Sequence, residues 1–173
     1  MNGEMGVMKQ ISALAAACVL MTAGAVQAGP VTRNAPVLSA DGEAQMVLAA
    51  QKACRAQGYR VAVAIADRHG LIRALLTDDG VGALDIASAT HKAKGAAVTG
   101  RPTAFLAKIP KEAQAYVDLI KSVEPDVALI GGGMPLVVDG QVIGAIGIGG
   151  APNGDADEMC AQAALALLPK AAG

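Results

Sequence analysis

The chain has 173 residues and a formal net charge of −1, enough chain for one ordinary domain. Hydrophobic residues make up 53% of it and aromatic residues only 2%, so the core must be built mainly from Ala, Val, Ile and Leu. No dense basic run occurs, and nucleic-acid binding needs one to neutralise phosphates. We therefore exclude nucleic acid as a partner. We also expect a domain this poor in aromatics to gain stability as a homo-oligomer.

The N-terminus is typical of an export signal. Lys9 supplies a positive charge, residues 11–25 form an uncharged apolar run, and residues 26–28 suit a cleavage site. We predict a signal peptide over residues 1–28 and a periplasmic or secreted protein. A transmembrane anchor is the alternative, but the run is short and weakly hydrophobic for one. No stable membrane span is expected after cleavage.

The next part of the chain predicts an extended lead-in over residues 29–40 and one domain over residues 41–173. Ser39 or Asp41 can cap a helix that runs to about residue 57. Residues 59–66 alternate with β-branched side chains and residues 71–77 form a second strand, so the two make a hairpin. A helix follows over residues 84–98, and Thr103 can cap a short helix over residues 104–108.

The C-terminal half predicts more strands than helices. Residues 109–125 favour a helical turn and a loop, and residues 127–130 a short strand. Residues 135–138 and 141–148 form a hairpin around Asp139-Gly140, a strong two-residue turn signal. Asp155 or Asp157 can start the last helix. The predicted fold class is α+β, a single domain with an antiparallel five-stranded sheet covered by helices on one side.

Two cysteines remain once the leader is removed, Cys54 and Cys160, both on apolar stretches of predicted helices. An oxidising compartment allows a disulfide, but we favour two separate buried hydrophobic side chains. The lack of a Cys-x-x-Cys motif and the presence of only two histidines argue against a structural zinc site.

Two glycine-rich segments stand out, one over residues 144–150 and the other at Gly131, Gly132 and Gly133. The first lies within and after a hairpin strand instead of leading into a parallel crossover, so it predicts close packing and not a dinucleotide loop. The second exposes successive backbone N–H groups, which can hold a carboxylate or another anion. A plain tight connection is an equal alternative for this second segment.

The richest polar cluster consists of His91, Lys92, Arg101 and Thr103. On a helix His91 and Lys92 diverge by about a quarter-turn, so both cannot face the core. A neutral imidazole can ligate haem iron, and a cation beside it can pair with a propionate. A solvated helix face is the simpler alternative. No spacing identifies a catalytic nucleophile, and the acidic residues are mostly explained as turn residues and helix caps.

Several segments, taken together and in order, resemble the GlcG/HbpS-like family. They are residues 61–67 (VAVAIAD), 89–93 (ATHKA), 100–103 (GRPT), 131–135 (GGGMP), 139–147 (DGQVIGAIG) and 157–158 (DE). They span nearly all of the chain after the leader. The resemblance implies an antiparallel five-stranded sheet, higher homo-oligomers and haem binding, with haem sensing, storage or degradation as possible roles.

The resemblance also implies site residues. Lys92, Thr103, the three glycines at 131–133, Asp157 and Glu158 match motif positions, so we expect a ligand pocket among them. For haem, we expect His91 or Thr103 near the iron, and Lys92 or Arg101 near the propionates. One departure stands out: where the family usually has Arg-Met-Asp-Gly after its second strand, this chain has residues 77–80 as TDDG, so a cation is replaced by an acid.

Two functions are consistent with these patterns. The first is an exported haem-binding protein. The alternative is an enzyme or binding protein for a small carboxylate or related metabolite, held by the glycine N–H groups with Lys92 as electrostatic partner. No catalytic residue is identified, and an oligomeric scaffold without a catalytic site remains a third possibility.

Overall fold

The computed structural model describes residues 34–170, which belong, from Ala35 onward, to one compact unit. The predicted signal peptide and the first part of the predicted lead-in lie outside the described residues. The elements in chain order are α1 (Ala40–Ala56), β1 (Ala62–Asp67), β2 (Ile72–Thr77), α2 (Ala83–Thr99), α3 (Thr103–Ala107), the 3-10 helix η1 (Lys111–Ala113), α4 (Gln114–Val123), β3 (Gly133–Val138), β4 (Gln141–Gly149) and α5 (Gly154–Leu165).

Side-chain N-caps mark the starts of the first and last helices. The Ser39 hydroxyl accepts a hydrogen bond from the Gly42 N–H at 3.1 Å, which makes Ser39 the N-cap of α1. Asn153 caps α5 by accepting from the Ala156 N–H at 2.9 Å, so neither Asp155 nor Asp157 is the cap. No helix within residues 34–170 has both the length and the apolar character needed to cross a bilayer.

The strands form one antiparallel sheet in the order β2-β1-β4-β3. The predicted α+β class is confirmed, and both predicted hairpins are present. Asp139 and Gly140 turn between β3 and β4 with φ values of 49° and 73°, the left-handed pair that a two-residue hairpin turn requires. The predicted number of strands is wrong, because the sheet described has four strands instead of five.

The missing strand is residues 127–130, which lie along α2 instead of joining the sheet. The Ala128 N–H donates to the His91 carbonyl of α2 at 3.0 Å. Val127 and Leu129 are buried in a small cluster with Leu106 and Val117. A short apolar segment can be buried against helices as well as in a sheet, and the local sequence pattern does not distinguish the two cases.

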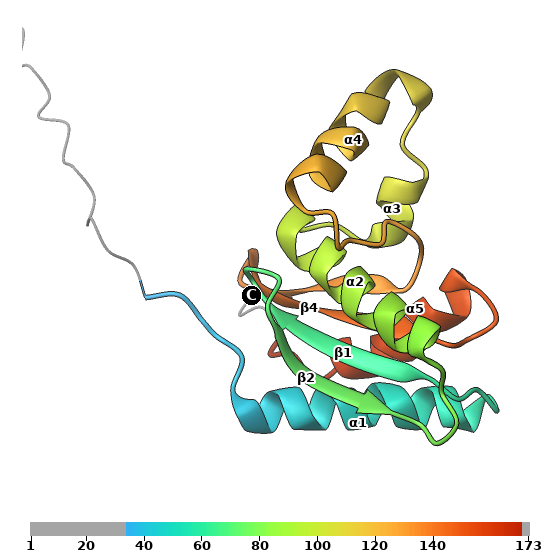
Figure 1. Cartoon of the computed structure of the whole chain (residues 1–173). Coiled ribbons are helices and arrows are strands. Elements are labelled where there is room, and N and C mark those ends of the chain that lie inside the picture. The colour runs from blue at the N-terminus through green and yellow to red at the C-terminus, as the bar shows by residue number, and fades with distance from the viewer. Residues whose placement is uncertain (1–33, 171–173) are drawn as a thin grey trace, which may run out of the picture. The chain divides into compact units, whose positions relative to one another are not determined.

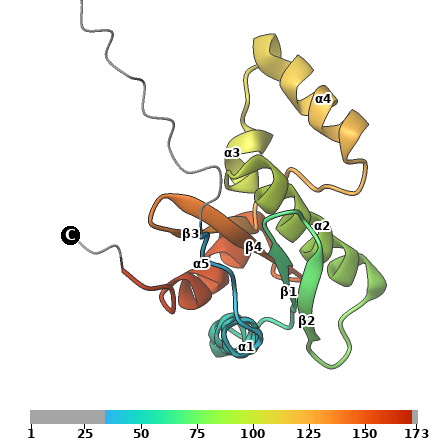
Figure 2. The same ribbon diagram turned by 90° about the vertical axis from the view of Figure 1, so that its left-hand side faces the viewer.

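Helices cover both faces of the sheet, so the predicted one-sided arrangement is also wrong. Figure 1 and Figure 2 show α2 across one face and α1 with α5 against the other. On the α2 side β1 contributes only small side chains, Ala62, Ala64 and Ala66. On the opposite side β1 contributes Val63 and Ile65 to the main core with α1 and α5. Both faces of β1 are apolar, as a strand buried on two sides requires.

Helices α3 and α4 form a small lobe beside α2, away from the sheet (Figure 1). Sequence reasoning expected a helical turn and a loop over residues 109–125, whereas α4 is a ten-residue helix. Only Val117 of α4 is buried, while Tyr116, Leu119 and Val123 are exposed. The apolar residues of α4 nevertheless recur at helical spacing, so the sequence carries a helical signal here that the prediction did not use.

The glycines of β4 allow α2 to approach the sheet closely, as the sequence predicts. A Cβ atom added to Gly147 would collide with the Ala89 carbonyl and the Ala93 amide of α2, and one added to Gly149 would collide with the Asp85 carbonyl. The facing residues on β1 are alanines. The α2 helix therefore packs backbone against backbone on this part of the sheet.

A disulfide joins Cys54 on α1 to Cys160 on α5, with Cα atoms 5.2 Å apart. Both side chains are fully buried, as expected, but the favoured interpretation of two separate hydrophobic side chains is wrong. The sequence shows no more than that each cysteine lies on an apolar helix face. The packing of α1 beside α5 on the same face of the sheet brings the two sulfur atoms together.

We predict that the double variant Cys54→Ala, Cys160→Ala has a lower free energy of unfolding, by about 2–5 kcal/mol. The bond links residues 106 positions apart, and a cross-link that closes a long loop restricts the unfolded chain most. Urea denaturation measures the effect. A reducing agent should destabilise the wild type and leave the double variant unchanged. Alkylation of both cysteines in unreduced, unfolded protein would contradict the bond.

The Gly147→Ala variant tests the close packing of α2. The added methyl group meets backbone atoms of α2, which cannot rotate away, so we expect a loss of at least about 2 kcal/mol in the free energy of unfolding. The control is Gly82→Ala, where φ is −80° and the nearest atom lies 3.9 Å away. That variant should lose no more than about 1 kcal/mol in urea denaturation. Equal losses in the free energy of unfolding of the two variants would show that close packing is not the reason for a glycine at position 147.

Candidate functional site

A buried ion pair between Lys92 and Asp157 lies at the centre of the predicted site residues. Lys92 on α2 is 4% exposed and Asp157 in the first turn of α5 is 2% exposed. The Lys92 Nζ donates to Asp157 Oδ2 at 2.6 Å and to the Ile148 carbonyl of β4 at 2.9 Å. The other carboxylate oxygen accepts from the Ala151 N–H at 3.2 Å. This pair therefore links α2, β4 and α5.

Burial raises the pKa of Asp157 above its ordinary value, and desolvation is the largest cause. The hydrogen bond and charge of Lys92 act in the opposite direction, as does the Ala151 N–H. A carboxyl group with a raised pKa in the folded state adds most to stability below the ordinary pKa of aspartate. That contribution is lost as the pH rises through the raised value.

Gly132 packs against this ion pair, while Gly133 packs against the Lys92 carbonyl and the Thr103 side chain, and Gly131 against the Gly154 backbone. A Cβ atom at Gly132 would lie 2.7 Å from Asp157 Cβ and 2.9 Å from Lys92 Nζ, and Gly132 has a φ of +114°. Its N–H donates to Glu158 Oε1 at 3.3 Å, and the Gly133 N–H donates to the Thr103 hydroxyl oxygen at 2.9 Å. Two of the three N–H groups therefore already have partners in this chain, one of them a carboxylate.

Thr103 is fully buried at the start of α3. Its hydroxyl donates to the Ile130 carbonyl at 2.5 Å and accepts from the Gly133 N–H. Thr103 is not the helix cap that the sequence predicts, because α3 already begins at this residue and Pro102 precedes it as N-cap. The hydroxyl instead ties α3 to the glycine segment, so iron ligation by Thr103 would require both of these bonds to be replaced.

His91 and Arg101 lie outside this buried network. The His91 side chain is half-buried and has no hydrogen-bond partner among residues 34–170. Arg101 is exposed, with its guanidinium 5.1 Å from the centre of the Phe105 ring. The structure thus brings seven of the nine predicted site residues together: Lys92, Thr103, Gly131, Gly132, Gly133, Asp157 and Glu158. Their role in ligand binding stays a prediction, as does that of His91 and Arg101.

The face of α2 that carries His91 leads to a cavity beside α4. Residues three or four apart share a helix face, so His91, Lys94 and Val98 lie in one row. Lys94 forms an ion pair with Glu124, at the end of α4, with Nζ and Oε2 2.7 Å apart. A cavity of about 300 Å³ lies here, lined by Val98, Thr99, Tyr116, Leu119, Ile120, Val123 and Glu124. Its lining is mostly apolar.

Carboxylate oxygens can bind a hard cation, but Asp67, Asp78 and Asp157 use theirs for hydrogen bonds within the chain. Asp67 Oδ1 accepts from the His69 and Leu71 N–H groups, which confirms its role in the β1–β2 turn. Within the part of the chain that the structure describes, no three His, Cys, Asp or Glu side chains are grouped so that they could hold a metal ion.

Residues 77–80 lack the arginine that is usual in the family, but another part of the fold supplies a cation beside this loop. Arg55, in the last turn of α1, donates from Nε to Asp78 Oδ1 at 2.5 Å. A cation therefore lies beside this loop although its own sequence lacks one. Sequence reasoning missed Arg55, because a basic residue in the last turn of a helix is ordinary and its partner lies 23 positions away.

The family is established by comparison with known proteins. The family model described as "Haem degrading protein HbpS-like" matches residues 38–166. The chain belongs to the HbpS-like family. The resemblance to GlcG/HbpS-like proteins inferred from the motifs is thereby confirmed. The protein GlcG of Escherichia coli is 31% identical over 118 residues, which cover 65% of this chain and 81% of that protein.

Solved structures share the fold over most of the chain. HbpS of Streptomyces reticuli, solved as a double mutant, is 32% identical with a TM-score of 0.71, covering 83% of this chain and 99% of that one. A complex of PduOC with haem is 27% identical with a TM-score of 0.69, covering 77% of this chain and 96% of that one. The protein ORFY of Klebsiella pneumoniae, 21% identical with a TM-score of 0.73 and coverage of 82% and 99%, shares the fold.

We predict that Lys92→Met lowers the free energy of unfolding by about 3–5 kcal/mol near neutral pH, because it leaves the Asp157 carboxylate buried without a cation. The loss should shrink as the pH falls toward the ordinary aspartate pKa of about 3.9, since protonation removes the uncompensated charge. Urea denaturation over a range of pH values measures both effects.

The control is Lys94→Met on the same helix. The Lys94–Glu124 pair is partly exposed, with side chains 24% and 35% accessible, so its removal should lower the free energy of unfolding by no more than about 1 kcal/mol. Equal losses in the two variants would show that the Lys92–Asp157 pair has no special structural role.

Proposed function

We propose that this protein binds haem. The observation that carries the proposal is membership of the HbpS-like family, together with structural similarity to PduOC, a relative solved with haem, over most of both chains. The buried network around Lys92 is not the haem site in this proposal. Lys92 and Thr103 are buried and their polar atoms are already bound within the chain.

The haem site we propose is the face shared by α2 and the α3–α4 lobe. Haem needs apolar contacts for the porphyrin, a ligand for the iron and cations for the propionates. The cavity beside α4 and the exposed side chains of Phe105 and Leu119 supply apolar surface. His91 is the residue we propose for the iron, because its side chain is partly exposed and lies on the row of α2 residues that leads to this cavity. Arg101 is the residue proposed for a propionate.

We also propose that the protein works as a homo-oligomer. The lobe exposes large apolar side chains, among them Phe105, Leu119 and Val123, and exposed apolar patches of this kind are typical of interaction sites. A second copy packed on the lobe would enclose a ligand more fully than a cavity of about 300 Å³ in one chain can.

Export to the periplasm or beyond is a further proposal. The Cys54–Cys160 disulfide supports it, since structural disulfides persist in oxidising compartments. Haem sensing, storage and degradation share the binding step and differ in the later fate of the haem.

A haemin titration followed by absorbance tests the proposal. We expect a saturable Soret band at about one haem per chain or per pair of chains. His91→Ala should weaken binding at least about tenfold, or change the band position, because the variant lacks the proposed iron ligand. Arg101→Gln should weaken binding less, since a propionate contact at the surface is partly replaced by water.

His69→Ala is the matched control, because His69 is the other of the two histidines and lies exposed in the β1–β2 turn. It should bind haemin like the wild type. Thr103→Val keeps the shape of the side chain but removes the hydroxyl. It therefore tests whether Thr103, the other predicted iron ligand, is needed for haem binding. A featureless wild-type titration would refute haem binding, and equal losses in the His69 and His91 variants would refute the role of His91.

A further inference from the structure

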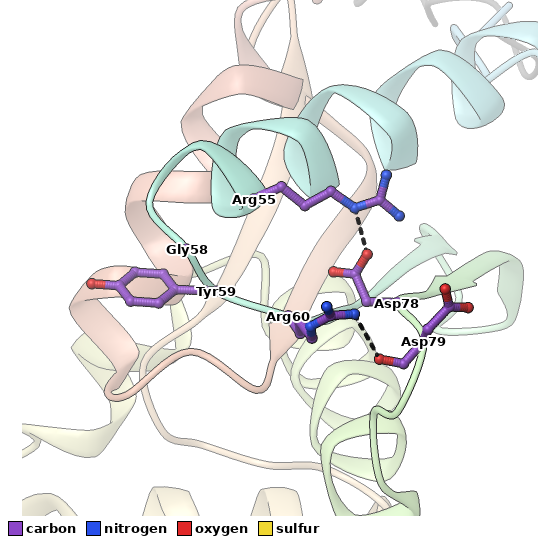
Figure 3. Close-up of a pocket in the computed structure, with 6 residues that line it drawn as sticks. All are labelled: Arg55, Gly58, Tyr59, Arg60, Asp78 and Asp79. Atoms are coloured by element: carbon purple, nitrogen blue, oxygen red, sulfur yellow. Dashed lines mark hydrogen bonds and ion pairs between the residues drawn. The ribbon is translucent and has the colours of Figure 1, made fainter.

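A polar cavity of about 420 Å³ lies at the end of the sheet where β1 begins and β2 ends. It is lined by Arg55, Gly58, Tyr59, Arg60, Asp78 and Asp79 (Figure 3). None of these residues lines the cavity beside α4 or belongs to the buried Lys92 network. This cavity is therefore a separate feature of the molecule, and haem binding on the α3–α4 lobe does not explain it.

A buried carboxylate fixes one side of this cavity. The Asp78 side chain is 3% exposed and accepts two hydrogen bonds, from the Val61 N–H at 2.8 Å and from Arg55 Nε at 2.5 Å. Among residues 34–170, Arg55 thus uses only Nε, and its terminal N–H groups are left for another partner. Because the Asp78 carboxylate is itself held by the backbone, the Arg55 guanidinium is oriented before any ligand arrives.

Arg60 supplies a second guanidinium at the same cavity. Its Nη1 donates to the Asp79 carbonyl at 3.2 Å, which leaves most of its five N–H donors unused among the described residues. Figure 3 shows Asp78 between the two arginine side chains, with the Tyr59 ring directed away from them. Two oriented guanidinium groups are the arrangement that binds carboxylate and phosphate oxygens best.

We propose that this cavity binds a small molecule through a carboxylate or phosphate group, with Arg55 and Arg60 as the binding residues. Asp78 is a positioning residue, because its charge is used to orient Arg55. The Asp79 carboxylate lies at the same cavity and opposes an anion, so it limits the affinity. This proposal is independent of haem.

NMR titrations that follow the Arg55 and Arg60 side-chain Nε–H signals test it, with sodium succinate and inorganic phosphate as separate probes and chloride replaced to hold the ionic strength constant. We expect saturable shifts at both arginines. Arg55→Gln and Arg60→Gln should each weaken binding about tenfold or more, since each removes charged hydrogen bonds. Asp79→Asn should strengthen binding several-fold, because it removes the opposing charge.

Lys52→Gln is the matched control: Lys52 is an exposed cation on α1, about one turn before Arg55, and does not line the cavity. It should leave the affinity unchanged. In the part of the chain that the structure describes, the Arg60 side chain donates only to a backbone carbonyl, so the Arg60 variant keeps the test valid if the Arg55 variant fails to fold. Saturation by succinate, by phosphate or by both supports the site and identifies the group recognised. Shifts that do not saturate with either probe, or equal weakening by Lys52→Gln, would overturn it.

Discussion

The buried ion pair between Lys92 and Asp157 constrains much of the structure around it. A charge removed from water must find its counter-charge and further hydrogen bonds in the fold, and here those partners come from α2, α5 and β4. The space beside the pair is then so limited that Gly132 admits no Cβ atom. The motif residues therefore cluster because they stabilise one another.

This constraint separates structural residues from residues that can reach a ligand. Lys92 and Thr103 point into the network, whereas His91, next to Lys92, is half-buried and Arg101, two residues before Thr103, is exposed. Consecutive residues on a helix differ by about 100° in direction, so one segment can hold the fold together and still present an imidazole to a partner. A motif match marks both kinds of residue alike, and only the contacts of each side chain distinguish them.

The α1 helix has a comparable double role at the other side of the sheet. Cys54 joins it covalently to α5, and the adjacent Arg55 extends to the buried Asp78 at the end of β2. The disulfide thus holds the last turn of α1 where the guanidinium can be oriented. The two proposed ligand sites use different elements, α2 with the α3–α4 lobe for haem and α1 with the β1–β2 strand ends for a small anion.

The sequence by itself determined the features that depend on local chemistry: the α+β class, the two hairpins, the turn at Asp139-Gly140, the close packing at the β4 glycines and the family. The tertiary structure alone decided which distant groups meet. It placed residues 127–130 against α2 instead of in the sheet and covered both sheet faces. It also joined Cys54 to Cys160, and gave the Thr103 hydroxyl and two glycine N–H groups partners within the chain. Periodicity and turn signals report the preferences of neighbouring residues, whereas these contacts depend on the packing of segments far apart in the sequence, which no local pattern records.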